Sequence, residues 1–321
     1  MADTSFADRL IMASRAKRSQ VVVGLDPRPE MMPSALMEEA VKNRGRTAEA
    51  VGLAFGRFNL GIIEAVRDHA VAVKPQIAFY ERFGRAGLNA YVQTLEAARE
   101  SGLLVIGDVK RNDIGSTAAA YARGHLFGEE EGEGWLGGMD FRVDAITINP
   151  LFGYDGVSPF LKRAAEGGGG IFALVKTSNP SSTELQDLET PEGLVYEKLA
   201  DYVAEWGKPY CGENGYSLLG AVVGATFPEE LESLRTRMPR TIFLVPGFGA
   251  QGGGVSDVVG AFDEEGDGAV VNSSRGIIYA FRREPYSEKY GPAQWAQAAG
   301  EACREMKEQI WEATHPEEAG D

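Results

Sequence analysis

The sequence predicts an α/β protein built as a closed (β/α)₈ barrel, the TIM barrel fold. Short runs rich in β-branched residues recur along the chain, a longer stretch of helical pattern follows each run, and polar residues gather where the runs end. Nearly continuous apolar runs separated by helix-sized segments are typical of parallel strands that helices cover. Eight such units within about 250 residues fit a closed barrel better than an open sheet.

The predicted strands follow one another along the chain with a helical segment after each. We place them at residues 20–25, 70–74, 103–108, 144–149, 171–176, 219–224, 241–245 and 269–272. We expect residues 1–321 to form a single barrel domain, with a helix before the first strand and another at the carboxyl terminus. Residues 28–45 and the acidic, glycine-rich residues 124–142 interrupt the pattern, and we interpret both as excursions from the barrel.

Polar residues mark the carboxyl ends of these strands. In a barrel all these ends meet at one mouth, where barrel enzymes keep their chemistry. Residues that are distant in sequence therefore become neighbours. The residues concerned are Asp26, Lys74, Asp108, Lys110, Asn149, Ser178, Pro246 and Arg275.

The segment DVKRNDI, residues 108–114, places charge directly after the apolar run 103–107. Side chains alternate along a strand, so Asp108 and Lys110 point the same way and Asp113 lies beyond the strand end. An ion pair that ends a buried strand is weak grounds for stability, because desolvation offsets the Coulomb attraction. We therefore interpret this carboxylate and ammonium cluster as the reaction centre.

The glycine-rich segment after the seventh strand, Gly247 to Gly252, fits the dinucleotide fingerprint G-x-G-x-x-G. Its context argues against a dinucleotide, because the next strand ends in Asn272 rather than in an acidic residue. The backbone N–H groups of such a loop suit a phosphate, and loops after the seventh and eighth strands of a barrel often hold one. We expect Gln251 and Arg275 to complete a phosphate site.

Composition argues against several classes of function. The 32 basic and 47 acidic residues give a net charge of −15, which disfavours a nucleic-acid or anionic-membrane surface. No stretch approaches the roughly 20 apolar residues of a membrane span. Two cysteines and three histidines, none at ligand spacing, argue against a disulfide framework, a metal site or a histidine triad. We expect a cytoplasmic protein with no metal and no nucleic-acid partner.

The segment D-x-K-x-x-D-I-x-x-T, Asp108 to Thr117, resembles the signature of the orotidine 5′-phosphate decarboxylase family. The order of the supporting segments on a barrel frame makes the resemblance specific, and it covers most of the chain. The segments VGLDPRPE, KPQIAFYERFG and NPLFGYDG resemble the longer bacterial branch of the family. The supporting segments are GLD at 24–26, Lys74 after the second strand, P-G-x-G-A-Q-G-G at 246–253 and Arg275 after the last strand.

The resemblance implies cofactor-independent decarboxylation of orotidine 5′-phosphate to UMP, the last step of de novo pyrimidine biosynthesis. Loss of CO₂ leaves an electron pair at C6 of the pyrimidine, where no carbonyl group absorbs it. Lys110 would stabilise this carbanion and then donate a proton. Asp108 would lie near the departing carboxylate, and Lys74 would join the alternating charges of Asp108, Lys110 and Asp113.

The resemblance also implies a homodimer with shared active sites, because Asp113 and Thr117 would reach into the partner's site. Without the resemblance, Asp113 before the helical pattern STAAAYA is more simply an N-cap. Asp26 would bind the ribose hydroxyls. Ser178 would contact the pyrimidine, with Thr177 as its rival for that role. The other residues expected to bind substrate are Pro246, Gln251 and Arg275.

Three other functions fit the same residues. A sugar-phosphate decarboxylase of the same superfamily shares the D-x-K core but uses a metal, so a chelator distinguishes it. A Schiff-base aldolase would use a neutral, nucleophilic Lys110, which borohydride would trap in the presence of substrate. The third is a barrel that binds a phosphate ligand without chemistry, and the intact array of Asp108, Lys110 and Asp113 argues against it.

Overall fold

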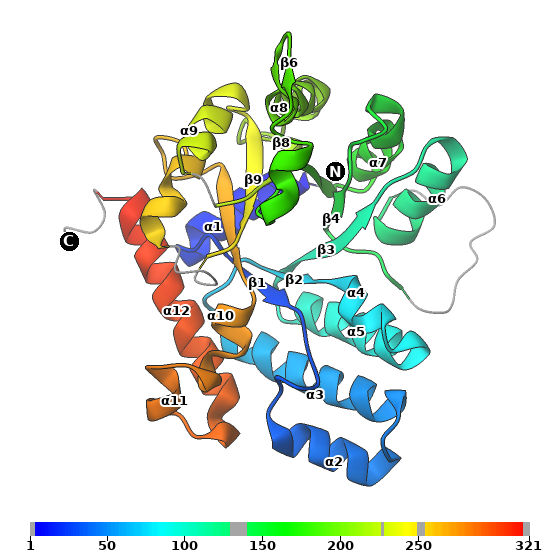
Figure 1. Ribbon diagram of the computed structural model, residues 1–321, viewed down its shortest axis with the longest axis vertical. Helices are drawn as coiled ribbons and strands as arrows, with labels where there is room; N and C mark the ends of the chain where they lie inside the picture. Colours follow the sequence, from blue (N-terminus) through cyan, green and yellow to red (C-terminus); the bar gives the residue numbers. More distant parts are fainter. Residues whose placement is uncertain (1–3, 129–139, 226–227, 249–253, 317–321) are drawn as a thin grey trace.

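The computed structural model of the protein describes residues 4–128, 140–225, 228–248 and 254–316. Within them, eight parallel strands close into a barrel in the order β1, β10, β9, β8, β5, β4, β3, β2, with helices around it (Figure 1). The predicted TIM barrel is thus confirmed, and each strand lies within a few residues of its predicted run. The barrel strands are β1 (Val21–Leu25), β2 (Ala72–Pro75), β3 (Leu104–Arg111), β4 (Ala145–Ile148), β5 (Gly170–Lys176), β8 (Ser217–Val223), β9 (Thr241–Pro246) and β10 (Ala269–Ser273).

Helices separate most of the strands. Among the described residues, none is long and apolar enough to cross a membrane. The α-helices are α1 (Phe6–Lys17), α2 (Ser34–Arg44), α3 (Ala48–Val66), α4 (Ile77–Glu81), α5 (Gly84–Glu100), α6 (Gly115–His125), α7 (Tyr154–Glu166), α8 (Val195–Gly207), α9 (Pro228–Arg237), α10 (Arg275–Ile278), α11 (Tyr286–Lys289) and α12 (Trp295–Thr314). Short 3₁₀ helices lie at Pro180–Glu184, Lys208–Tyr210, Val255–Asp257, Val259–Ala261, Ala280–Arg282 and Pro292–Gln294.

The loop after β5 contains a small antiparallel ribbon that the sequence did not predict. Its strands, β6 (Glu189–Thr190) and β7 (Gly193–Leu194), are two residues long each. Strands this short carry too few residues for an alternating pattern to be recognised. The ribbon leads directly into α8.

Successive residues of each strand point alternately into the barrel and outward toward the helices. Val22 packs inside the barrel, whereas its neighbours Val21 and Val23 pack against the helices. Helix α1 closes the amino end, because Phe6 meets the interior ring of Phe172 edge to face, with ring centroids 5.9 Å apart. A filled interior confines chemistry to the carboxyl end of the barrel.

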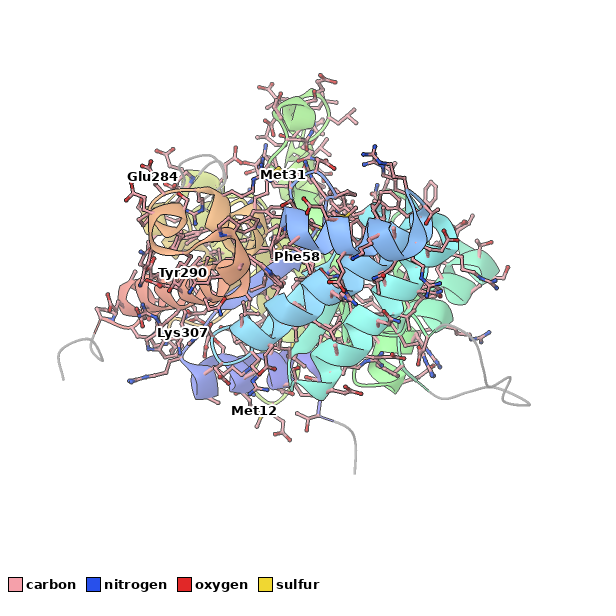
Figure 2. The ribbon with its side chains drawn as sticks, turned by 90° about the horizontal axis from the view of Figure 1, so that it is seen from below. Met12, Met31, Phe58, Glu284, Tyr290 and Lys307 are labelled. Atoms are coloured by element: carbon pink, nitrogen blue, oxygen red, sulfur yellow. The ribbon has the colours of Figure 1, made fainter. Side chains whose placement is uncertain are left out.

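Helix α3 is fixed to the segment that follows the last strand. The Thr47 hydroxyl caps its amino end by accepting from the Ala50 N–H at 3.3 Å. Phe58 of α3 is labelled in Figure 2. Its ring stacks on Tyr279 with ring centroids 5.8 Å apart, and packs on Trp295 of α12 at 5.0 Å. These aromatic contacts hold the first and last units of the barrel together.

The excursion at 28–45 contains a helix that the sequence did not predict. Helix α2 lies on the outer side of α3 (Figure 1), with Met37 and Val41 partly buried against the core. Ala40 is its one fully buried residue, so the apolar pattern that would have predicted it is weak. Of the second excursion, residues 129–139 lie outside the described part of the chain.

Candidate active site

Two lysines share one carboxylate at the mouth of the barrel. The Lys74 Nζ lies 2.6 Å from Asp108 Oδ2, and the Lys110 Nζ lies 2.5 Å from Asp108 Oδ1. The side chains of Lys74 and Asp108 are 7% and 9% exposed, whereas that of Lys110 is 46% exposed. The structure therefore brings these three predicted residues together and leaves Lys110 accessible from the mouth.

Thr147 of β4 fixes this cluster, and the sequence prediction did not include it. Its hydroxyl donates to Asp108 Oδ1 at 2.9 Å and accepts from the Lys110 backbone N–H at 3.0 Å. Thr147 is 1% exposed and lies two residues after the inward-facing Ala145. In the sequence, a hydroxyl residue at an inward-facing position near the end of a predicted strand is the pattern that would have identified Thr147.

The backbone bends at Lys110. Its φ of +44° lies in the left-handed region, and the pairing of β3 with β4 shifts register between Gly107 and Arg111. A left-handed residue other than glycine costs on the order of 1 kcal/mol, and such strain clusters at functional sites. The bend carries the chain out of the strand while the Lys110 side chain stays on Asp108.

Mutual attraction keeps Lys74 and Asp108 charged despite their burial. Burial favours the neutral acid of Asp108, but Lys74 and Lys110 outweigh it and hold the pKa of that carboxyl well below its usual range. Burial likewise opposes the charge of Lys74, but attraction to Asp108 and Asp26 raises the pKa of its ammonium above the ordinary value. Around neutral pH the pair is a carboxylate and an ammonium.

Two oxygens near the first and last strands are buried without a hydrogen-bond partner among the described residues. They are Oδ1 of Asp26, which follows β1, and Oδ1 of Asn272 in β10. Glycine is required at Gly24 between them, because a side chain there would collide with Ser274. An unpaired buried polar atom costs about 1–3 kcal/mol, which favours a role in ligand binding.

The structure does not bring Asp113 to the cluster of its own chain. Its Oδ1 accepts from the Ile114 N–H at 2.8 Å, and no hydrogen bond or ion pair among the described residues joins it to Asp108 or Lys110. Helix α6 begins at Gly115 with Ile114 in the N-cap position, so Asp113 is not the N-cap. Thr117, in the first turn of α6, is exposed.

The predicted phosphate residues lie at the ends of two neighbouring strands. Pro246 ends β9 and pairs with Asn272 of β10, and Arg275 begins the short helix α10 three residues later. Arg275 is exposed. Gln251 lies outside the described residues, so its role stays a prediction.

The two rivals for the pyrimidine contact differ in their hydrogen bonds. The Thr177 hydroxyl donates to Asn179 Oδ1 at 2.7 Å and accepts from Gln186 Nε2 at 2.7 Å. No described residue hydrogen-bonds the half-buried Ser178 hydroxyl. Ser178 is therefore the hydroxyl that is available to a ligand.

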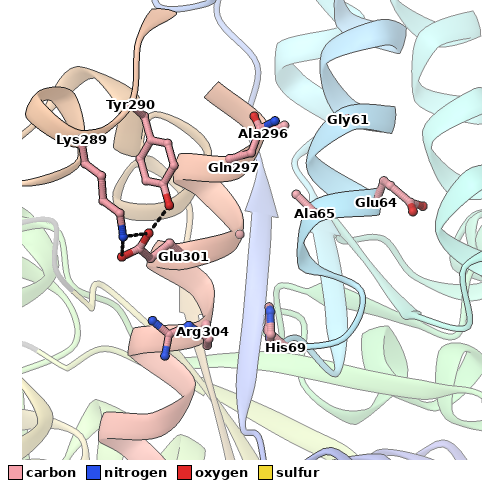
Figure 3. A pocket seen from close by; sticks show the side chains of 11 residues that line it. Gly61, Glu64, Ala65, His69, Lys289, Tyr290, Ala296, Gln297, Glu301 and Arg304 are labelled. Carbon is pink, nitrogen blue, oxygen red and sulfur yellow. Dashed lines mark hydrogen bonds and ion pairs between the residues drawn. The ribbon is translucent and has the colours of Figure 1, made fainter. Parts of the chain in front are cut away.

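A separate pocket lies on the outer surface, between α3 and α12 (Figure 3). It has a volume of about 630 Å³, and in its wall Lys289 and Tyr290 both bond to Glu301. None of the cluster residues at the mouth lines it. Among the described residues, no three His, Cys, Asp or Glu side chains come together in a way that would hold a metal ion.

Residues 19–290 match the Orotidine 5'-phosphate decarboxylase / HUMPS family. The chain belongs to this family. An orotidine 5′-phosphate decarboxylase from Rhodopirellula baltica is 43% identical over 306 residues, which are 95% of this chain and 99% of that protein. One from Caldicellulosiruptor saccharolyticus is 39% identical over 287 residues, 88% of this chain and 92% of that protein. The structure of Leishmania donovani OMP decarboxylase matches with a TM-score of 0.69 and 31% identity, over 96% of this chain and 98% of that one.

Membership of the orotidine 5′-phosphate decarboxylase family confirms the resemblance that the sequence motifs indicated. It also confirms the predicted enzyme class, a decarboxylase that breaks a carbon–carbon bond. Both curated relatives carry the decarboxylase name, which favours that activity over the sugar-phosphate alternative.

Proposed function

We propose that this chain decarboxylates orotidine 5′-phosphate to UMP, the last step of de novo pyrimidine biosynthesis, without a cofactor. The observation that carries the proposal is the accessible Lys110 ammonium, held 2.5 Å from a buried carboxylate at the barrel mouth. A Schiff-base aldolase needs a neutral, nucleophilic lysine at this place, whereas Lys110 forms an ion pair with Asp108. The names of the relatives at 43% and 39% identity support the same substrate.

The proposed reaction uses Lys110 twice. When the bond between C6 and the carboxylate breaks, its electron pair stays on C6 and CO₂ leaves. The Lys110 ammonium stabilises this pair electrostatically at short range. Its proton then forms the new C6–H bond, and the neutral amine regains a proton from solvent. Asp108 and Lys74 keep the ammonium in place, and the Asp108 charge repels the substrate carboxylate before it leaves.

The proposed substrate contacts surround this centre. We assign the ribose hydroxyls to Asp26, whose Oδ1 is buried without a partner among the described residues. We assign the pyrimidine to Ser178, because the Thr177 hydroxyl is already engaged. The phosphate end falls to Pro246, Gln251 and Arg275, at the ends of the strands where barrels often bind phosphate.

We also propose a homodimer in which Asp113 and Thr117 complete the partner's site. Large apolar side chains are exposed beside Asp113: Ile114 is 55%, Leu151 76% and Phe152 52% exposed. The two loops that carry them are adjacent, since a side chain on Gly156 would meet Phe152 and the Asp113 carbonyl. A contiguous apolar surface of this kind favours a protein interface.

The proposed location is the cytoplasm, and the proposed organisation is one barrel domain. Cys211 and Cys303 are free thiols, which suits a reducing compartment. The net charge of −15 disfavours nucleic acid as a partner.

The activity is tested by following the loss of orotidine 5′-phosphate absorbance with the wild-type protein. We expect turnover that a chelator leaves unchanged. Borohydride added with substrate should leave Lys110 unmodified by mass spectrometry. An inactive wild type would end the proposal, chelator-sensitive turnover would favour the metal-dependent alternative, and a trapped lysine would favour the aldolase.

Shared sites are tested by mixing two inactive variants, Lys110→Ala and Asp113→Ala. Each mixed dimer has one site with both residues intact, so equal mixing should restore about a quarter of the wild-type rate. Lys110→Ala alone, taken through the same mixing procedure at the same total concentration, is the control. If Asp113 acts in its own chain, the mixture stays inactive.

A further inference from the structure

Gln186 and Asp187, in the loop after β5, contact Lys176 and Thr177 at the end of that strand. The Gln186 side chain binds Thr177 twice: Oε1 accepts from the Thr177 N–H at 2.9 Å, and Nε2 donates to the Thr177 hydroxyl at 2.7 Å. The Asp187 carboxylate pairs with the Lys176 ammonium. We refer to Gln186 and Asp187 as the loop clamp.

Lys176 anchors one half of the clamp from inside the protein. Its side chain is 2% exposed, lies 3.6 Å from Glu230 of α9, and sits 4.4 Å from the ring centroid of Tyr196 in α8. A buried ammonium needs such partners, because the protein interior does not solvate it as water does. Asp187 is therefore fixed by a group that cannot turn into solvent.

The backbone of Gln186 is fixed as well. Its N–H donates to the Ser182 carbonyl at 2.9 Å, and its carbonyl accepts from the Tyr196 N–H at 2.9 Å. The carboxamide thus projects from a rigid frame toward the end of β5. Side chains held in this way lose little entropy when they hold a neighbour in place.

Ser178 lies between the clamp and the adjacent strand β8. On the far side, the Gly224 N–H donates to the Lys176 carbonyl at 2.9 Å. A side chain on Gly224 would place its Cβ 2.9 Å from Ser178 Cβ and 3.0 Å from Ser178 N, so glycine is needed for this close approach. The backbone before Ser178 is held from both sides, while its hydroxyl stays available.

We propose that the loop clamp is a positioning device for Ser178, which orients this hydroxyl toward the pyrimidine of the substrate. Gln186 acts by fixing Thr177, and Asp187 by fixing Lys176. Neither touches a reacting atom. The proposal deepens the proposed function, since it rests on the contact between Ser178 and the pyrimidine.

The test compares two ligands that differ in the base. Binding of UMP and of ribose 5-phosphate is measured by calorimetry for Gln186→Ala, Ser178→Ala and the double variant. Each single variant should bind UMP about tenfold more weakly and ribose 5-phosphate unchanged, as loss of one oriented hydrogen bond implies. The double variant should be no weaker than Ser178→Ala alone, because the clamp acts through Ser178. Gln186→Glu keeps the acceptor for the Thr177 N–H, so its loss should be smaller.

Leu185→Ala is the matched control, because Leu185 precedes the clamp in the same loop and is 70% exposed. It should bind both ligands as the wild type does. Unchanged UMP affinity in Gln186→Ala, equal losses for both ligands, or additive losses in the double variant would each overturn the proposal. If Ser178→Ala bound UMP as tightly as the wild type does, Ser178 would have no role in binding the pyrimidine, and the proposed role of the clamp would fall as well. Turnover of orotidine 5′-phosphate by the wild type tests the activity separately.

Discussion

Two lysine and carboxylate pairs in this protein have nearly the same N–O distance and different surroundings. Lys74 and Asp108 are 2.6 Å apart at the barrel mouth, and Lys289 and Glu301 are 2.7 Å apart in the outer pocket of Figure 3. The first pair has side chains 7% and 9% exposed, whereas Lys289 is 59% exposed. An exposed pair is screened by water and contributes little, but a buried one must stay paired. Burial, and not distance, separates a reactive charge cluster from a surface contact.

The largest expected difference between the two regions is in catalysis. Lys110→Ala should lower kcat/KM for orotidine 5′-phosphate at least about a thousandfold, because it removes both carbanion stabilisation and the proton donor. Lys289→Ala is the matched control, since it removes a lysine that also pairs with a carboxylate. Absorbance assays of both variants give the comparison. Equal rates in Lys110→Ala and the wild type would contradict the assigned mechanism.

The second difference is in stability. Asp108→Asn keeps the shape of the side chain but leaves the buried Lys74 ammonium without its carboxylate. We expect the free energy of unfolding to fall by about 3 kcal/mol, the cost of breaking a buried pair. Glu301→Gln makes the same change in the outer pocket and should leave the urea midpoint within the scatter of repeat measurements. Two equal urea midpoints would show that burial of the first pair carries no such cost.

The smallest expected difference concerns two histidines, His125 at the end of α6 and His69 in the outer pocket. Burial, followed by repulsion from Arg111, lowers the pKa of His125 to about 4 from 6.5. The unfolded state therefore binds the proton first as pH falls through this interval, so stability is lost between pH 6.5 and about 4. The loss attributable to His125 is below about 1 kcal/mol at pH 6 and approaches the full effect of the shift only near pH 4.

Unfolding curves at several pH values test this expectation. His125→Gln should flatten the pH dependence of the free energy of unfolding more than His69→Gln does. Burial also lowers the pKa of His69, but His69 is only half-buried. Parallel curves for His125→Gln and the wild type would show that His125 does not bind its proton differently in the two states.

Much of the site was predictable because it depends on local periodicity. Alternation along a strand predicted that Asp108 and Lys110 come together, and in the structure Asp108 pairs with both Lys110 and Lys74 at the barrel mouth. The strands themselves were recognisable from continuous apolar runs. By contrast, helix α2 buries only Ala40 completely, so its amphipathic pattern was too weak to predict it.

The sequence alone determined the barrel, the family and the residue types at its mouth, because apolar periodicity and short motifs are properties of neighbouring residues. Tertiary structure decided how those residues meet. Thr147 bridges Asp108 and Lys110 from another strand, and the left-handed turn at Lys110 accompanies a register shift between strands. The clamp of Gln186 on Thr177 likewise joins a loop to a strand end. Each depends on hydrogen-bond geometry between segments that only folding brings together: strand spacing can place a residue such as Thr147 at the mouth, but it does not identify its partners.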